Sequence, residues 1–296
     1  MPFSHVLLAL SVIAIWGINF VVIQIGLREL PPIFLTFLRF FFAAFPAVFF
    51  IKRPQIPFKM LFAYAMLMFT LDFAFLFSGM YAGVSSGIAS LTLQTQVFFT
   101  AILAMIFLKE KLTSWQILGA LVAFSGIGLV AINTGGDVNT LGLLLVEFAA
   151  LSWAGGNLVS KKIGKVDMFS LVVWGSLVAW PPLLLLSFIL EYGKWSIESI
   201  LNVSWLTIGT VAYLVYPVTL FGFAIWSWLL SRHAASTVAP FTLLVPIFGF
   251  SSSALILGEG MQGWKMGAGF LIVSGLVINL YGGKLFALFL NTQAKK

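Results

Sequence analysis

Ten stretches of this chain are each long and apolar enough to cross a lipid bilayer as an α-helix. A span needs roughly 20 mostly apolar residues. The sequence offers such stretches at about 6–26, 33–51, 60–80, 86–108, 115–133, 141–160, 169–190, 204–229, 236–257 and 264–284. Pro31-Pro32 and Gly135-Gly136 fall between stretches, where helices are expected to end. The sequence therefore predicts an all-α integral membrane protein with ten transmembrane helices.

The composition agrees with this prediction and argues against several other classes of protein. Of all residues, 61% are hydrophobic and 8% are charged, whereas a soluble domain carries about 25% charged residues. The formal charge of +7 is spread over short loops and forms no basic stripe, so no nucleic-acid partner is expected. With no Cys and two His, we expect no disulfide and no metal site. The chain lacks a GxxxxGK[ST] loop, and no cofactor is expected.

Lys and Arg are distributed unequally between the two sets of loops. The side that holds the N-terminus has twelve of them, and the opposite side has only Arg28, Lys194 and Lys265. Cytoplasmic loops of membrane proteins carry the excess of Lys and Arg. Both ends of the chain are therefore predicted to lie in the cytoplasm.

The second half of the chain repeats features of the first half. Four residues return 149 positions later: Glu110, Trp115, Ser125 and Gly126 recur as Glu259, Trp264, Ser274 and Gly275. A Trp also leads a cluster of small residues and Asn near the start of each half, at Trp16-Gly17-Ile18-Asn19 and Trp153-Ala154-Gly155-Gly156-Asn157. Each half has five spans, an odd number, so the halves must cross the membrane in opposite directions. We predict two inverted repeats, 1–134 and 135–296, a construction that many secondary transporters use.

Few ionisable side chains lie inside the spans, and Arg39, Asp72 and Glu147 are the clear ones. At about 1.5 Å per residue, Arg39 lies roughly 9 Å below the outer face. Asp72, Asn19 and Gln94 lie roughly 18–21 Å from the inner face of a hydrocarbon core about 30 Å thick. Four polar side chains from the first four spans are thus expected near one depth. Ionisable groups at such a depth are functional candidates, although Glu147 is expected to be a rim or packing residue.

Two interpretations of this polar layer stay open. In the first, it binds a zwitterion: Arg39 takes a carboxylate through a bidentate contact, Asp72 takes an ammonium, and Asn19 and Gln94 supply further hydrogen bonds. In the second, Arg39 and Asp72 neutralise each other as a buried pair that fixes helix packing. Asp72 is also the candidate for proton coupling.

Aromatic and amide side chains from both halves are expected to complete this site. Trp16, Trp153 and Tyr216 lie within spans, and a Trp or Tyr ring attracts an ammonium. Asn157 belongs to the second small-residue cluster and is grouped with them. Tyr216 precedes Pro217, which removes a helix hydrogen bond and allows a kink near the membrane centre.

The order and spacing of several motifs resemble one known family. The motifs are WGINFVVIQIGL followed by LPP, LRFFFAAFPAVFF, LQTQVFFT, SWAGGN and VAPFTLLVP. They resemble the EamA-type exporters of the drug/metabolite transporter superfamily. The resemblance implies two inverted five-helix repeats around a central cavity, in a bacterial cytoplasmic (inner) membrane. It also implies efflux, without ATP, of amino acids or derivatives such as cysteine and O-acetylserine. Asp72 departs from the family, in which a neutral polar residue is usual, and this leaves the substrate open.

Other functions remain compatible with these residues. Aromatic amino acids or drugs are alternative substrates, and facilitated diffusion is an alternative to proton-coupled export. An intramembrane enzyme is the alternative class, but the chain has no HExxH, no Cys and no paired aspartates within spans. The expected partners are a small zwitterionic substrate, the lipid bilayer and, for coupled export, protons.

Overall fold

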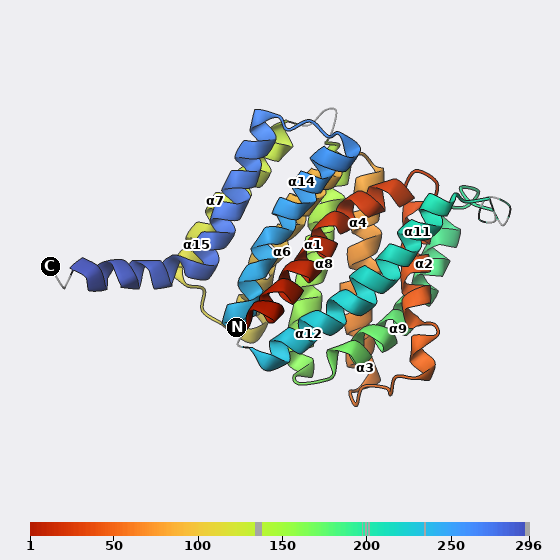
Figure 1. Cartoon of the computed structure of the whole chain (residues 1–296), viewed down its shortest axis with the longest axis horizontal. Coiled ribbons are helices and arrows are strands. Elements are labelled where there is room, and N and C mark those ends of the chain that lie inside the picture. Colours follow the sequence, from red (N-terminus) through yellow and green to blue (C-terminus); the bar gives the residue numbers. More distant parts are fainter. Residues whose placement is uncertain (134–137, 197, 199, 201, 234, 294–296) are drawn as a thin grey trace.

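In the part of the chain that the computed structural model describes, nine helices are long and apolar enough to cross a membrane, and a shorter apolar helix covers Phe241–Leu257. The structure describes residues 1–133, 138–196, 198, 200, 202–233 and 235–293, and these contain no β-strand (Figure 1). The prediction of an all-α membrane protein with ten transmembrane helices is therefore confirmed, the ninth helix being the shortest.

Several predicted spans consist of more than one helical element. The elements are, in order, α1 (Phe3–Gly26), α2 (Pro32–Ala44), η1 (Ala47–Phe49), α3 (Phe58–Ala65), η2 (Met66–Leu71), α4 (Asp72–Tyr81), α5 (Ser86–Thr92), η3 (Leu93–Thr95), α6 (Gln96–Leu108), α7 (Ser114–Ile132), α8 (Thr140–Ile163), α9 (Met168–Leu190), α11 (Trp205–Tyr213), η4 (Leu214–Phe221), α12 (Gly222–Arg232), α13 (Ala235–Val238), η5 (Ala239–Leu244), α14 (Val245–Leu257) and α15 (Gly263–Gln293). The third, fourth, eighth and ninth spans each join three elements end to end.

The helix boundaries follow from local capping residues. Asn139, Asp167 and Ser204 precede α8, α9 and α11, and their side chains accept hydrogen bonds from amides of the first turn. Thr113 forms a capping box with Gln116 at the start of α7. Such caps satisfy amides that have no partner within the helix. Short polar connections therefore separate the apolar helices, as the sequence predicts.

Contacts between helix ends define the face that holds the N-terminus. His5 near the start of α1 is hydrogen-bonded to His233 after α12, with 2.7 Å between Nδ1 and Nε2. Lys161 of α8 pairs with Glu110, which follows α6. We call this face the inner face, in keeping with the predicted orientation.

Glutamates join helix ends on the opposite face, which we call the outer face. The carboxylate of Glu191, after α9, accepts hydrogen bonds of 2.8 and 2.9 Å from the amides of Ile33 and Phe34 at the start of α2. Glu29, after α1, accepts a hydrogen bond of 2.9 Å from the amide of Ser204, before α11. A carboxylate stabilises the positive end of a helix dipole, so these contacts fix the helices at this face.

The two halves share the positions of their helical irregularities. The third and eighth spans each contain a π-helical segment, η2 and η4, and the fourth and ninth each contain a 3-10 segment, η3 and η5. A shift of 149 residues places η2 at 215–220, within η4, and η3 at 242–244, within η5. This correspondence supports the predicted repeat. The predicted boundary between residues 134 and 135 lies outside the described residues.

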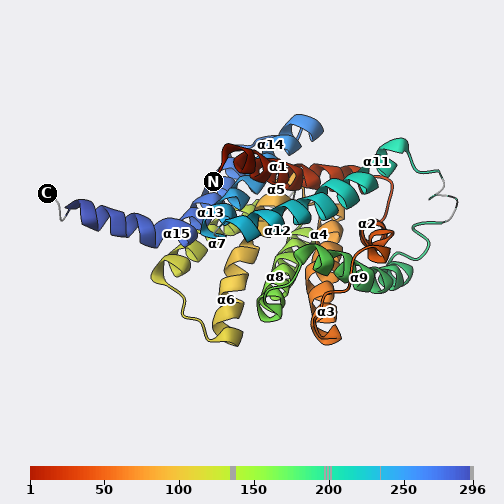
Figure 2. The same cartoon turned by 60° about the horizontal axis from the view of Figure 1, so that its bottom comes forward.

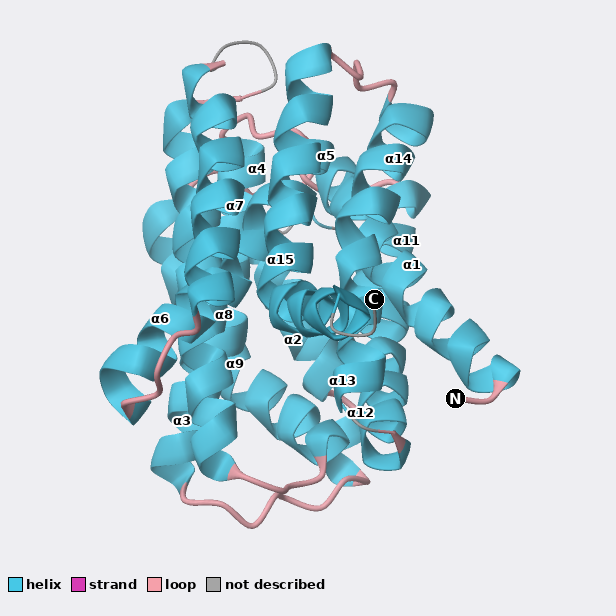
Figure 3. Ribbon diagram, turned by 90° about the vertical axis from the view of Figure 1, so that its left-hand side faces the viewer, coloured by secondary structure: helices cyan, strands magenta, loops and turns pink. Residues whose placement is uncertain are grey.

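Helices α7 and α15 lie side by side and run in opposite directions (Figures 1 and 3). A Cβ atom on Gly119 would lie 2.5 Å from the carbonyl oxygen of Gly275, and one on Gly126 would lie 3.0 Å from that of Ala268. The shift of 149 residues exchanges these two contacts, because Gly119 corresponds to Ala268 and Gly126 to Gly275. Small residues allow such close helix packing. Antiparallel packing of two corresponding helices is what an inverted repeat requires.

Candidate functional site

A small cavity of about 110 Å³ lies in the middle of the bundle, where spans from both halves meet. Five of the eight predicted site residues line it: Trp16, Asn19, Arg39, Gln94 and Trp153. The remaining lining residues are Phe20, Phe73, Leu76, Leu93, Gln96, Val218, Phe223, Thr242 and Val245. The cavity is thus mostly apolar, and its polar lining consists of one cation, three side-chain amides and the hydroxyl of Thr242.

The guanidinium of Arg39 is held from two sides. Its Nε atom donates a hydrogen bond of 3.0 Å to Oγ1 of Thr219, in the π-helical segment η4. Its Cζ atom lies 4.0 Å from the centre of the Phe73 ring, within range of a cation–π contact. Its Nη1 atom is buried and has no hydrogen-bond partner among the described residues. A buried guanidinium donor without a partner is costly, and an anionic group entering the cavity would satisfy it.

Amide side chains supply the other polar groups of the cavity. Asn19 is buried, and its Oδ1 atom has no hydrogen-bond partner within the described part of the chain. Gln94 and Gln96 come from the junction of η3 and α6, where the 3-10 turn places two glutamines close together. Asn19 Oδ1 is therefore an acceptor for a donor on a bound molecule.

Aromatic rings form much of the remaining wall. Trp16 donates a hydrogen bond of 3.1 Å from Nε1 to the carbonyl oxygen of Val218, which fixes its ring against the second half. Its ring centre lies 5.6 Å from that of Phe223. Trp153 lies on the other side, with its ring centre 6.4 Å from that of Phe73. These rings offer faces to a cation or to apolar atoms.

Asp72 lies behind the cavity and does not line it. Its side chain is fully buried, and neither carboxylate oxygen has a hydrogen-bond partner among the described residues. Asp72 and Arg39 attract each other, but no ion pair within 4.0 Å joins these two described side chains. The alternative interpretation, in which Arg39 and Asp72 form a direct buried ion pair, therefore does not describe this structure. Asp72 begins α4 directly after the π-helical η2, and the cavity wall at this point is its neighbour Phe73.

Asn157 and Tyr216 also lie away from the cavity. Asn157 donates hydrogen bonds of 3.3 Å to Oε1 of Gln96 and 3.1 Å to Oγ1 of Thr100, so it positions a cavity residue from outside. Tyr216 is exposed and lines an outward-facing groove instead. It lies two residues before Val218, which lines the cavity, and a step of two residues along a helix is a rotation of about half a turn. This rotation explains why Tyr216 points to the opposite side.

Two residues at this site had no sequence signal that singled them out. Thr219 contacts Arg39, but it is an ordinary hydroxyl in an apolar run. Phe73 is one of 31 Phe residues. The motif LQTQ did contain Gln96 beside Gln94, so its spacing carried some indication. Glu147, expected to be a rim or packing residue, accepts a hydrogen bond of 2.9 Å from Thr95, directly next to Gln94.

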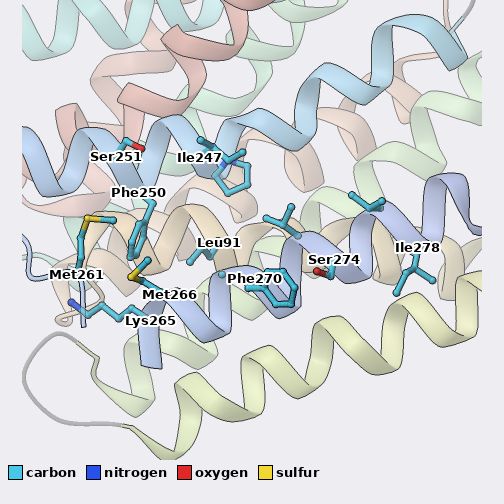
Figure 4. A pocket seen from close by; sticks show the side chains of 14 residues that line it. Leu91, Ile247, Phe250, Ser251, Met261, Lys265, Met266, Phe270, Ser274 and Ile278 are labelled. Atoms are coloured by element: carbon cyan, nitrogen blue, oxygen red, sulfur yellow. The ribbon is translucent and has the colours of Figure 1, made fainter. Parts of the chain in front are cut away.

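A larger groove of about 490 Å³ lies between α14 and α15 (Figure 4). Phe250, Met266 and Phe270 line it, and its wall is almost entirely apolar. A smaller groove between α6 and α7 is its counterpart, because every lining residue of the smaller groove corresponds, 149 positions later, to a lining residue of the larger one. The lining residues of the smaller groove are Phe98, Ala101, Ile102, Leu112, Gln116, Ile117, Ala120, Leu121 and Phe124. Lys265 also lines the larger groove, but the central cavity combines a guanidinium with three side-chain amides, so it is the better candidate site.

Comparison with known proteins decides the family. The sequence profile of the EamA-like transporter family matches residues 3–132 and again residues 140–281. The chain belongs to the EamA-like transporter family. The two matches cover the first and the second predicted repeat separately. This membership identifies the protein as a multi-pass membrane protein of the transporter class and agrees with the resemblance of its motifs.

Relatives of this EamA-like protein extend over nearly the whole chain. It is 40% identical over 282 residues to the "Probable amino-acid metabolite efflux pump" of Escherichia coli and to that of Salmonella typhimurium, covering 93% of this chain and 94% of each relative. An uncharacterized transporter of Archaeoglobus fulgidus is 29% identical, with 92% of this chain and 97% of the relative covered. A solved crystal structure, 17% identical, has the same fold with a TM-score of 0.63 over 94% of this chain and 96% of that chain.

Within the described residues of this EamA-like protein, no group of three or more His, Cys, Asp or Glu is placed to hold a metal ion. The polar groups that line its central cavity are one guanidinium, three side-chain amides and the hydroxyl of Thr242, beside aromatic rings. Such groups can form hydrogen bonds and ring contacts with a small molecule.

Proposed function

We propose that this protein is a secondary transporter that exports small zwitterionic amino acids or their derivatives by alternating access, without ATP. The observation that carries the proposal is the buried Nη1 donor of Arg39, which has no partner among the described residues and borders the central cavity. A substrate carboxylate is the complement of this donor. The 40% identity to probable amino-acid metabolite efflux pumps supports the same class of substrate.

The ammonium of the substrate is proposed to meet amide oxygen and aromatic rings rather than a carboxylate. None of the described residues that line the cavity is Asp or Glu, so an ion pair with Asp72 is not the direct contact. Oδ1 of Asn19 is without a partner among the described residues, and the rings of Trp16 and Trp153 line the same cavity. Hydrogen bonds and cation–π contacts would then replace the ion pair.

The size of the cavity favours a small substrate over a drug. Its volume is about 110 Å³, whereas pockets for drug-sized ligands measure roughly 300–1,000 Å³. Substrates such as cysteine or O-acetylserine belong to the smaller class. We also propose location in a bacterial inner membrane with both ends in the cytoplasm, supported by the twelve Lys and Arg on the face of the N-terminus.

Counterflow of radiolabelled amino acids in proteoliposomes tests the proposal. We expect exchange of small zwitterions by the wild type, and a loss of roughly 10- to 100-fold in Arg39→Ala, the effect of removing hydrogen bonds to a charged group. Arg39→Lys should also be impaired, because an ammonium cannot reproduce the planar guanidinium. Arg53→Ala is the matched control: Arg53 also lies over a Phe ring, that of Phe58, but outside the spans. Absence of exchange with every zwitterion tried would contradict the proposal.

A further inference from the structure

The fourth and ninth spans cross closely in the outer half of the bundle. There α5 packs against α14, and a Cβ atom on Gly249 would lie 2.6 Å from Cβ of Ser90. Apolar side chains near the outer face, such as Leu30, Met80 and Ile88, are buried in the same hydrophobic core. The outer side of the bundle is therefore closed in this structure.

Glu259 ties this crossing together at the outer face. It follows α14, and its carboxylate accepts hydrogen bonds of 2.9 Å from the amide of Ser86 and 3.3 Å from that of Gly87. These amides belong to the first turn of α5, where a carboxylate is favourable because it complements the helix dipole. Glu259 thus connects the end of the ninth span to the start of the fourth.

Glu110 is the counterpart of Glu259, and the two residues share their local backbone. Both directly follow a left-handed residue that ends a helix, Lys109 with φ 57° and Gly258 with φ 67°. Both amides bond at 3.4 Å to corresponding carbonyls, Glu110 to Ala104 and Glu259 to Ser253. The repeat therefore presents a glutamate in the same manner at each face.

The carboxylates of the two glutamates have different partners. Glu110 is half-exposed and pairs with Lys161 of α8 at the inner face. The positions that correspond to Ser86 and Gly87 are Ala235 and Ser236, which begin the ninth span at the inner face. Within the described residues, α6 has no packing against α13 or η5 comparable to that of α5 against α14. The fourth and ninth spans thus meet at the outer face, whereas Figures 2 and 3 show the C-terminal end of α6 lying apart from α13.

We infer that Glu259 and Glu110 are alternating latches: Glu259 holds the outer side closed, and Glu110 bonds to the start of the ninth span when the inner side closes. The inner crossing has the residues for this exchange. In the sequence, Gly249 and Phe250 of the outer crossing correspond to Thr100 and Ala101, and Ser90 corresponds to Ala239. Both spans would therefore present small residues at the inner crossing. Small residues permit close approach of helices. This gating role rests on the proposed alternating-access function and adds the residues that bias its two states.

The absence of Cys from the chain allows a direct test with one introduced thiol. Ser90→Cys places a reporter in the outer crossing, where Ser90 is fully buried. In nanodiscs, its reaction with a water-soluble maleimide reports opening of the outer side, whichever way the protein faces. We expect Glu259→Ala to raise this rate roughly fivefold, the shift in an equilibrium that loss of one helix cap produces. Glu259→Gln, which keeps one acceptor oxygen, should give a smaller increase.

The decisive result is the opposite effect of the two glutamates. Added to Glu259→Ala, Glu110→Ala should lower the rate again, because it destabilises the outward-open state. If Glu110 served only to pair with Lys161 in the present state, Glu110→Ala and Lys161→Ala would both raise the rate, and the inference would be overturned. It would equally be overturned if neither glutamate changed the rate.

Glu29→Ala is the matched control. Glu29 also caps a helix at the outer face, but the residue that corresponds to it in the second half is Val178. Glu29 therefore has no counterpart at the inner face, and its substitution should leave the labelling rate unchanged. Because labelling needs no substrate, failure of every amino acid in counterflow would refute the proposed substrate while leaving this test intact.

Discussion

The side chains of Arg39 and Thr219 are joined by a hydrogen bond of 3.0 Å, although they are 180 positions apart in the chain. Arg39 belongs to the first predicted repeat and Thr219 to the second. The second half thus fixes the one cationic side chain among the described residues that line the central cavity. The bond uses Nε and leaves Nη1 without a partner among the described residues. The guanidinium is therefore oriented before any substrate arrives.

Removal of the hydroxyl of Thr219 should weaken substrate binding. Thr219→Val keeps the shape of the side chain but loses the hydrogen bond to Arg39, and a bond to a charged group contributes about 1.5–3 kcal/mol. We expect roughly a tenfold rise in the substrate concentration for half-maximal counterflow. Thr219→Ser retains the hydroxyl and should behave like the wild type. Equal transport by the Val and Ser variants would show that this bond does not orient Arg39.

Asp72→Asn should abolish transport driven by a pH gradient while leaving counterflow at equal pH. Asp72 is buried next to the cavity wall and its carboxylate has no hydrogen-bond partner in the described part of the protein. Asn has nearly the same shape but cannot release a proton. Glu147→Gln is the comparison, because Glu147 already accepts a hydrogen bond from Thr95, and it should retain the response. A wild-type response of Asp72→Asn would exclude proton coupling through this residue.

A methyl group at Gly275 should destabilise the packing of α7 against α15. A Cβ atom there would lie 2.5 Å from the carbonyl oxygen of Gly119 and 2.7 Å from the amide of Ala123, and overpacking costs about 1–3 kcal/mol. We expect Gly275→Ala to lower the melting temperature in detergent. Gly128→Ala is the control within α7, since nothing lies within 4 Å of its Cβ position. It should leave the melting temperature unchanged or raise it.

The contact between His5 and His233 should make stability depend on pH. Desolvation lowers the pKa of His233, and the nearby His5, N-terminus and Arg232 lower it further. Below the unfolded pKa of about 6.5, the unfolded chain then binds more protons than the folded one. The stabilisation by neutral His233 is complete above that pH and is lost as the pH falls through the folded pKa.

Melting temperatures in detergent between about pH 5 and pH 8 measure this effect. The wild type should melt at lower temperature in acid, and His233→Gln should reduce this dependence. His233→Gln removes the titrating group but keeps a side chain able to hydrogen-bond to His5. If the melting temperature of His233→Gln changed with pH as steeply as that of the wild type, the acid-sensitive group would lie elsewhere.

Depth within the membrane could be predicted from the sequence because a helix rises by a fixed amount per residue. That count brought Asn19, Arg39 and Gln94 together, and all three line one cavity. It failed for the direction in which a side chain points. Asp72 has the expected position along its span but lies behind Phe73, and Tyr216 faces a groove on the outside.

The direction of these side chains depends on the packing of neighbouring helices. The π-helical segment η2 directly precedes Asp72, and the π-helical segment η4 contains Tyr216. Such segments change the rotation of the helix without changing its apolar composition. In a chain that is 61% hydrophobic, both the inward and the lipid-facing sides of most spans are largely apolar, so a strong amphipathic pattern seldom marks the face that turns inward.

The sequence by itself determined the ten membrane helices, the repeat of 149 residues and the polar layer, because length, composition and spacing fix these properties. Only the tertiary structure decided which polar groups share the cavity, that Thr219 rather than Asp72 contacts Arg39 directly, and that Glu259 and Glu110 have different partners. Two equivalent sequence segments cannot reveal such a difference, because it arises from the state in which the two halves pack together.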